Sequence, residues 1–338
     1  MIEAQLLTLF MAAMVAFGVG MYVFLDGFDL GVGILFLFGE NHDQRDRMMN
    51  SIVPFWDGNE TWLVFGGAIL LSAFPLAFSV ILPAVYLPVI VMLLGLIFRG
   101  VAFEFRFLHV QRTRRWDWAF SAGSIVATFS QGVVLGAFVQ GVKVQDGRYA
   151  GGPWDWLSSF SMLTGAALVC GYALLGATWL AWRTHGDLQR RSRYWIRPLL
   201  MGLLAAMAAV SVWTPLMSPR IEARWFSLPG VIAFLPVPLL SVACAWRVAR
   251  TALKVGSVLP FVFSIGLFFL SYTGLAISIF PLLPPPALSL FEAAASPKTQ
   301  LFLLPGLLVL VPLILWRTWL NYRVFQHQSD EDPGYGHG

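Results

Sequence analysis

The sequence predicts an all-α integral membrane protein with nine transmembrane helices, arranged as two four-helix bundles and one peripheral helix. Of the 338 residues, 58% are hydrophobic and 12% are charged, and the mean hydropathy is +0.72. Soluble domains carry roughly 25% charged residues, so lipid must be the solvent for most of this chain. Nine apolar stretches approach the length of about 20 residues that a helix needs to cross the hydrocarbon core. The loops between them alternate between rich and poor in basic residues.

The nine stretches follow one another along a single polytopic membrane domain, residues 1–338. The first is expected to stay in the membrane, since the start Met1-Ile-Glu carries an acid where a signal peptide has its basic region. The second and third are nearly continuous, and Phe74, Pro75 and Pro83 mark the tight turn between them. Proline and glycine inside other stretches are tolerated when neighbouring helices satisfy the backbone. The predicted spans are 6–38, 59–79, 80–98, 118–140, 160–182, 198–217, 226–246, 257–280 and 301–322.

The basic residues give these helices a direction. Five of the 22 lie in the even-numbered loops, and the remaining 17 lie in the odd-numbered loops and at the C-terminal end. Because cytoplasmic loops carry the excess of lysine and arginine, the N-terminus is expected in the periplasm and the C-terminus in the cytoplasm. The five basic residues of the outer side are Lys143, Arg148, Arg220, Arg224 and Lys298.

Several kinds of site are not expected in this chain. The net charge of +4 follows the membrane topology, so no nucleic-acid partner is expected. Both cysteines, Cys170 and Cys244, lie in apolar runs and should not form a disulfide. The sequence has no metal-type cluster and no nucleotide-binding motif. No axial haem ligand is expected within the spans, since the histidines fall in predicted loops or the tail, at His42, His109, His185, His327 and His337.

Two acids lie inside the first predicted span, in Leu25-Asp-Gly-Phe-Asp-Leu-Gly-Val-Gly33. Asp26 and Asp29 are three residues apart and share one helical face, while Gly27 and Gly31 allow another helix to approach closely. Acids inside a membrane are costly and are functional candidates by default. We expect Asp29 and Asp26 to handle protons. The alternative is a buried acid bonded to a neighbouring helix for structural reasons.

Two further acids, Asp57 and Glu60, begin the second span near the cytoplasmic surface. The helix dipole favours acids in a first turn, and aspartate can also cap a helix, so a structural role alone explains both. The first helix leaves the membrane on the same side. Asp57, Glu60 and Asp29 could therefore line one inward-opening file of carboxylates, of the kind that carries protons in pumps and transporters.

Charged residues also end the third span, in Phe98-Arg-Gly-Val-Ala-Phe-Glu-Phe-Arg106. Arg99, Glu104 and Arg106 are expected to form an interfacial ion-pair group or to extend toward lipid headgroups. In the fourth span, Gln131 and Gln140 are expected to hydrogen-bond neighbouring helices rather than a ligand.

Three motifs resemble those of subunit II of the cytochrome bd-type quinol oxidases. They are Gly27-Phe-Asp-Leu-Gly-Val-Gly33, Trp56-Asp-Gly-Asn-Glu-Thr-Trp62 and the segment Phe98–Arg106 quoted above. Chain length, helix number and the outside N-terminus extend the similarity to essentially the whole chain. The short loops, 141–159 in particular, look more like the cyanide-insensitive branch of the family and leave open whether this chain binds a quinone or a lipid.

The resemblance implies an enzyme component without catalytic residues of its own. The chain would form a heterodimer in the bacterial inner membrane with subunit I, which holds haems b and d, or haem b only. That complex oxidises quinol and reduces oxygen to water, and a small single-helix subunit can accompany the pair. The resemblance maps the family's proton-path acids to Asp29 and Asp57, with Trp56 beside the second.

Three functions are therefore weighed. The leading interpretation is a non-haem subunit that supports subunit I and supplies a cytoplasmic proton path. A proton-coupled secondary transporter would also need buried acids, but the sequence lacks paired broken helices in two matching halves. A structural membrane scaffold would use the same acids only to stabilise packing.

Overall fold

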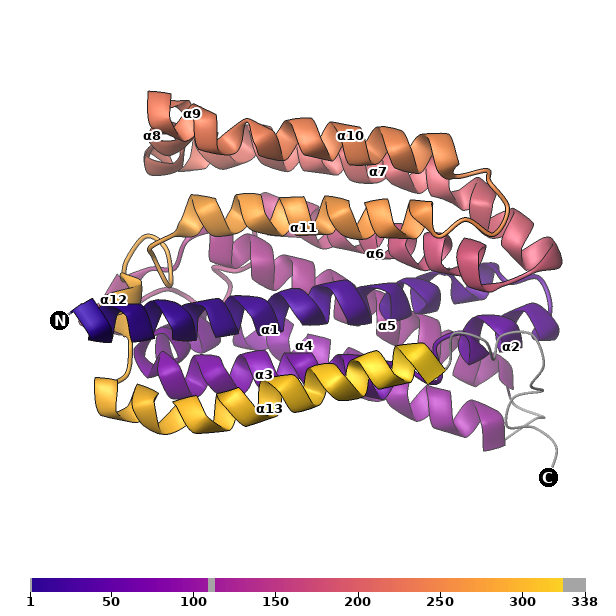
Figure 1. Cartoon of the computed structure of the whole chain (residues 1–338), viewed down its shortest axis with the longest axis horizontal. Coiled ribbons are helices and arrows are strands. Elements are labelled where there is room, and N and C mark those ends of the chain that lie inside the picture. Colours follow the sequence, from indigo (N-terminus) through magenta and orange to yellow (C-terminus); the bar gives the residue numbers. More distant parts are fainter. Residues whose placement is uncertain (1, 109–112, 325–338) are drawn as a thin grey trace.

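The chain is almost entirely helical in this computed structural model, which describes residues 2–108 and 113–324. Most helices run along one common direction (Figure 1). The strands of the described ranges form a short hairpin. In chain order the elements are α1 (Ile2–Leu35), the 3-10 helix η1 (Phe36–Phe38), α2 (His42–Asn50), α3 (Trp56–Ala73), α4 (Pro75–Leu108), α5 (Thr113–Gln140), β1 (Val144–Gln145), β2 (Arg148–Tyr149), α6 (Ser159–Arg183), α7 (Gly186–Met217), α8 (Pro219–Phe226), α9 (Leu228–Phe234), α10 (Pro236–Thr251), α11 (Leu259–Ile279), α12 (Leu290–Ala293) and α13 (Pro297–Val324).

Eight segments of the described chain are long and apolar enough to cross a membrane, which confirms the prediction of an all-α membrane protein. The predicted second span is the exception. Its helix, α3, has 18 residues, but the polar run Trp56-Asp-Gly-Asn-Glu60 occupies its first turns and lowers its hydropathy. The eight segments are Glu3–Phe38, Pro75–Arg106, Arg114–Gln140, Ser159–Arg183, Gly186–Met217, Leu228–Thr251, Leu259–Ile279 and Pro297–Val324.

The predicted boundary between residues 79 and 80 is wrong. α3 ends at Ala73, because Phe74 leaves the helical conformation (φ −133°, ψ 59°) and Pro75 begins the next helix. The residue before a proline is driven out of the helical region by the ring, so the break falls at Phe74. Pro83 does not end a helix; it lies inside α4 just before a kink at Val85 (φ −125°, ψ 20°).

The predicted spans 198–217 and 226–246 also differ from the structure. α7 begins at Gly186, well before residue 198, and its polar first turns extend it beyond the apolar stretch. The segment 226–246 is divided among α8, α9 and α10, with breaks at Ser227 and Leu235. Each of these helices has a proline in its first two positions, where the missing N–H is not needed.

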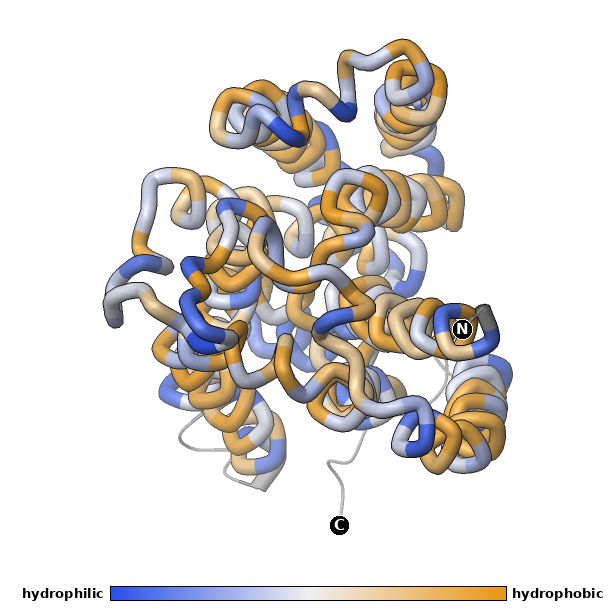
Figure 2. The backbone as a smooth tube through the Cα atoms, turned by 90° about the vertical axis from the view of Figure 1, so that its left-hand side faces the viewer, coloured by the Kyte–Doolittle hydropathy of each residue, from blue (hydrophilic) through white to orange (hydrophobic). Residues whose placement is uncertain are grey.

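α1 occupies a central place and packs against α3, α5 and α6. α13 lies outside α1 and α3, while α7 and α10 form an outer pair on the far side of α6 and α11 (Figure 1). The Phe28 and Trp179 rings stack at 4.2 Å between centroids and join α1 to α6 in the main core. Viewed from the end where the chain begins, hydrophobic residues run along the helices and hydrophilic ones gather in the connecting loops (Figure 2).

The loop between α5 and α6 is ordered by local interactions. β1 and β2 pair in an antiparallel hairpin whose turn is Asp146-Gly147, both with positive φ (51° and 71°), as a two-residue hairpin turn requires. Lys143 lies 3.0 Å from Asp155 on the surface, and the Lys143 ammonium lowers the pKa of the Asp155 carboxyl.

Two helix crossings depend on glycine because backbone meets backbone. A Cβ on Gly31 of α1 would overlap the carbonyl oxygen of Tyr172 in α6, and one on Gly176 would overlap the backbone of α1. A Cβ on Gly123 of α5 would lie 2.6 Å from the Gly95 carbonyl oxygen of α4. The close approach predicted from Gly27 and Gly31 is confirmed, and α6 is the helix that approaches.

Replacing Gly31 with alanine should lower the melting temperature of the purified protein, because the new methyl group forces α1 and α6 apart. Overpacked sites lose about 1–3 kcal/mol. Gly306→Ala in α13 is the matched control, since nothing lies within 4 Å of its Cβ position. Thermal unfolding in detergent measures both variants. Equal melting temperatures would show that the crossing tolerates separation.

Candidate functional site

A buried ion pair joins α1 to α4 inside the membrane-spanning region. Arg99 Nη1 donates to Asp26 Oδ1 at 3.1 Å, and the two side chains are 1% and 0% exposed. The same nitrogen lies 3.2 Å from Glu60 Oε1 on α3, whose side chain is 29% exposed. A buried charge without a partner is strongly unfavourable, so Asp26, Arg99 and Glu60 form one unit, the acid–arginine cluster.

The helix packing fixes the position of Arg99. A Cβ on Gly123 would come within 2.9 Å of the Arg99 backbone nitrogen, so α5 lies directly against this turn of α4. On another side the Arg99 guanidinium lies 5.9 Å from the centre of the Trp56 ring, an arrangement that stabilises a cation. Trp56 in turn packs on Phe103, 4.9 Å between ring centres. The Trp56 predicted beside the acids therefore contacts the cation that holds them.

Asp29 is held separately from Asp26. Its Oδ2 accepts a hydrogen bond of 2.7 Å from Asn59 Nδ2, which also lies 3.2 Å from the Leu25 carbonyl oxygen. Asp29 is fully buried, and its Oδ1 has no hydrogen-bond partner in the described part of the chain. Asn59 was not singled out from the sequence. Two features of the sequence could have identified Asn59 as a partner of the acids. It lies next to Glu60, three residues after Trp56, and its amide side chain can form hydrogen bonds.

A second polar connection crosses α1, α5 and α6. Tyr172 donates its hydroxyl hydrogen to Gln131 Oε1 at 3.2 Å, and Gln131 Nε2 donates to the Tyr22 hydroxyl oxygen at 2.7 Å. Both tyrosines are buried. The expectation that Gln131 bonds neighbouring helices is confirmed. Gln140, at the end of α5, also reaches a neighbouring helix: its Nε2 lies 3.9 Å from Met217 Sδ of α7, and its Oε1 accepts from Ser158 Oγ at 2.5 Å.

Asp57 makes none of the ion pairs of the acid–arginine cluster in the described part of the chain. Its side chain is exposed, and its carbonyl oxygen accepts from Thr61 Oγ1 at 3.1 Å. Glu60 instead contacts Arg99. The two acids of this helical turn therefore differ in environment, since Asp57 is exposed and Glu60 is ion-paired. The N-cap of α3 is Phe55 and no side chain caps it, but Asp57 lies in the first turn, where the helix dipole favours an acid.

Arg99 and Arg106 do not share one interfacial ion-pair group. Arg106 is buried and belongs to a separate cluster, with Nε 2.6 Å from Asp117 Oδ1 and Nη2 2.6 Å from Asp46 Oδ1. Arg45 also reaches Asp117, at 3.1 Å. Glu104 is exposed, and no ion pair joins it to either arginine among the described residues. Asp117 was not singled out from the sequence, although the flanking Trp116 and Trp118 indicate a membrane boundary.

Histidines and cysteines lie away from these clusters. His42 begins α2 and His185 precedes α7, whereas His109, His327 and His337 fall outside the described residues. Cys170 and Cys244 are free thiols. Within residues 2–108 and 113–324, no group of three histidine, cysteine or acidic side chains is arranged to hold a metal ion.

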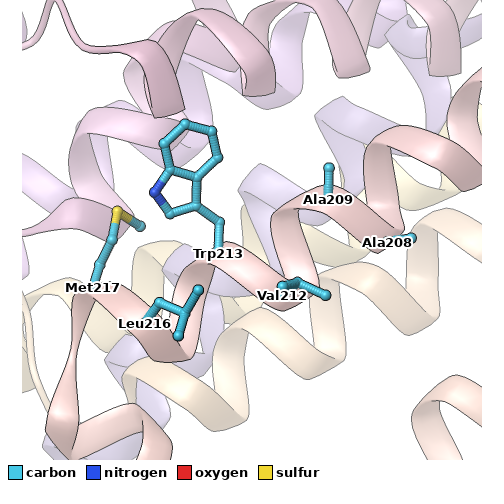
Figure 3. A pocket seen from close by; sticks show the side chains of 6 residues that line it. All are labelled: Ala208, Ala209, Val212, Trp213, Leu216 and Met217. Atoms are coloured by element: carbon cyan, nitrogen blue, oxygen red, sulfur yellow. The ribbon is translucent and has the colours of Figure 1, made fainter.

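One apolar groove of about 540 Å³ lies on α7 (Figure 3). It contains no ionisable side chain, and α7 contributes nothing to the acid–arginine cluster, so it is not the candidate site. Its lining residues are Ala208, Ala209, Val212, Trp213, Leu216 and Met217.

Comparison with known proteins gives consistent matches. The family described as cytochrome bd terminal oxidase subunit II matches residues 7–325. Cytochrome bd-I ubiquinol oxidase subunit 2 of Escherichia coli K12 is 30% identical over 346 residues, covering 91% of each chain. The Bacillus subtilis subunit 2 is 32% identical over 227 residues, covering 66% of this chain and 65% of that one. The solved bd oxidase of Geobacillus thermodenitrificans contains a chain of the same fold, with a TM-score of 0.77, 14% identity and coverage of 95% and 99%.

Arg99→Gln should lower the free energy of unfolding by about 3–5 kcal/mol, because Asp26 is then buried without its cation. The double variant Arg99→Gln with Asp26→Asn should recover much of that loss. Arg47→Gln is the control, since the Arg47–Asp43 pair is exposed and such pairs contribute at most about 1 kcal/mol. Thermal unfolding of the four proteins tests this. A double variant as unstable as the single one would exclude the proposed coupling.

Proposed function

The chain belongs to the cytochrome bd terminal oxidase subunit II family, and from this premise we propose that it supplies protons from the cytoplasmic side to the haem-bearing partner subunit. It is subunit II of a cytochrome bd ubiquinol oxidase, and so a component of an enzyme rather than an enzyme alone. Reduction of oxygen to water consumes protons that must cross part of the membrane. The observation that carries the proposal is the acid–arginine cluster, with Asp29 beside it, inside the spans.

The proposal places nine helices across the membrane, with α3 as the ninth. The 18 residues of α3 extend about 27 Å at 1.5 Å per residue, close to the thickness of a hydrocarbon core. α3 lies alongside α1 (Figure 1). With α3 included, 17 of the 22 basic residues lie toward one side, Arg99 among them within the span of α4, and 5 lie toward the other, which supports a periplasmic N-terminus and a cytoplasmic C-terminus. The grouping is then two four-helix bundles with α13 peripheral.

The contacts suggest an order of proton carriers in this orientation. Asp57 is exposed at the cytoplasmic end of α3 and would take up protons there. Glu60, one turn further in, is partly exposed and faces Arg99, which also holds Asp26. Arginine stays charged, so Arg99 holds the acids and does not itself carry a proton. Asn59 orients Asp29 and leaves its Oδ1 open to a proton.

The haems belong to subunit I in this proposal. His42 and His185 lie at the ends of helices, and the described spans of this chain contain no histidine. Haem supplies electron transfer and oxygen reduction when bound in the partner, while the side chains of this chain hold and move protons. A complex that copurifies with a larger haem-bearing chain supports this division. A preparation without haem that transports a substrate alone would favour the secondary transporter.

Asp57→Asn and Asp29→Asn should each lower oxygen consumption by the purified complex by about tenfold or more, because an amide cannot carry a proton in the relay. The visible haem spectrum should stay unchanged. Asp187→Asn is the control, since Asp187 is an exposed acid at the start of α7 that pairs with Arg190. Turnover in proteoliposomes measures all three. Equal turnover would remove the proton path, and loss of assembly in both path variants would favour the scaffold.

Thiol labelling tests the nine-helix topology. In a chain with Cys170→Ser and Cys244→Ser, Gln145→Cys should react with an impermeant reagent in intact spheroplasts. Asp43→Cys should react only after permeabilisation, because α3, α4 and α5 separate the two positions. Both positions are exposed. Labelling of both from the same side would mean that α3 does not span.

A further inference from the structure

The Tyr172–Gln131–Tyr22 connection ends one helical turn from Asp26. Tyr22 and Asp26 are four residues apart on α1, and residues at this spacing are neighbours on a helix surface. Gln131 is held in place by helix packing, because α5 and α6 cross closely at Gly132, the residue that follows it. A Cβ on Gly132 would lie 2.7 Å from the Gly165 Cα.

The hydrogen atoms of this connection all point one way. Tyr172 gives its hydrogen to Gln131, and Gln131 gives an amide hydrogen to the Tyr22 oxygen. The hydrogen of the Tyr22 hydroxyl is therefore not used within the connection. A buried donor without an acceptor is unfavourable, so this hydrogen needs an acceptor nearby.

Asp26 has a free acceptor at this position. Its Oδ1 is occupied by Arg99 at 3.1 Å. Its Oδ2 is buried and has no hydrogen-bond partner among the described residues. The spare donor of Tyr22 and the spare acceptor of Asp26 thus lie one turn apart on the same helix.

We propose that Gln131 is a positioning residue of the proton path, which acts by orienting the Tyr22 hydroxyl to donate to Asp26. This inference rests on the proposed function, since it concerns the same path. Arg99 then holds one carboxylate oxygen of Asp26 and Tyr22 holds the other. With both oxygens fixed, Asp26 keeps one geometry toward Glu60 each time a proton moves.

The structure explains why glutamine suits this place. A glutamine side chain offers both an acceptor and a donor, and Gln131 uses its acceptor toward α6 and its donor toward α1. Leucine has a similar size but neither function. The substitution Gln131→Leu therefore removes the orientation and leaves the volume nearly unchanged.

The test uses the purified two-subunit complex with ubiquinol as electron donor. Tyr22→Phe and Gln131→Leu should each lower kcat about tenfold or more while KM for the quinol stays constant, because the loss of a hydrogen bond to a charged group has an effect of about that size. The double variant should be no slower than Tyr22→Phe alone. In an Asp26→Asn background, Gln131→Leu should have no further effect, since coupled residues are not additive.

Tyr272→Phe is the matched control. Tyr272 is a partly buried tyrosine whose hydroxyl donates to the Ala16 carbonyl oxygen of α1 at 2.8 Å, away from Asp26. It should leave kcat unchanged. The haem spectrum and the yield of complex report assembly, and if Gln131→Leu fails to assemble, Tyr22→Phe carries the test because it removes a single oxygen atom.

The outcomes separate this inference from the proposed function. If Asp26→Asn lowers kcat while Tyr22→Phe and Gln131→Leu behave like Tyr272→Phe, the positioning role of Gln131 is overturned and the path remains. If Asp26→Asn leaves kcat unchanged, the path through Asp26 is overturned, and the role of Gln131 with it. Additive effects of Gln131→Leu and Asp26→Asn would also overturn the positioning role.

Discussion

The ion pair between Asp26 and Arg99 is the interaction on which the organisation of this subunit depends. Both groups are almost fully buried in spans, where an isolated charge is strongly unfavourable. Each charge therefore requires the other, and the helices that carry them must stay together. Glu60 adds a third helix to the same guanidinium. The proposed proton path and the packing of α1, α3 and α4 thus rest on one arginine.

Glycine crossings make this arrangement possible. α5 meets α4 backbone to backbone at Gly95 and Gly123, directly beside Arg99, and α6 meets α1 in the same way at Gly31 and Gly176. Without side chains at these points, the helices approach closely enough for short polar side chains to reach one another. Tyr172 lies at the Gly31 crossing, and Gln131 precedes Gly132, where α5 meets the backbone of α6. The small residues at the crossings thus determine where the polar side chains can form hydrogen bonds.

Hydropathy predicted much of the fold, because the lengths of apolar stretches depend on the bilayer alone. The spans predicted at 118–140, 160–182 and 257–280 lie within a few residues of α5, α6 and α11. The boundary near Phe74 was misplaced because a hydropathy window averages over the single residue that breaks the helix. Polar starts such as that of α7 were missed for the same reason.

The acids of the site, together with Arg99 and Gln131, could be singled out from the sequence, but the groups that each of them contacts could not. Asp26, Asp29 and Glu60 stand out because charges are rare in spans. Asn59 and Gln131 carry no charge, and their importance appears only when α1 lies beside α3 and α5. Arg99 and Arg106 are about 10 Å apart along α4. This distance is too long for both to bind Glu104, the acid that lies between them in the sequence. Each arginine instead forms ion pairs with acids on other helices. These acids lie in other segments of the sequence, so a local sequence pattern cannot predict the pairs.

The polar beginning of α3 has a consequence for biosynthesis. A segment that starts Trp56-Asp-Gly-Asn-Glu60 gains little by leaving the translocation channel for lipid on its own. Phe74 alone separates it from α4, which has the highest hydropathy of the candidate spans. α3 and α4 are therefore suited to leave the channel together as one helical hairpin, with α1 already in the membrane to receive the polar face. On this account Arg99 and Asp26 meet while the chain is still being made.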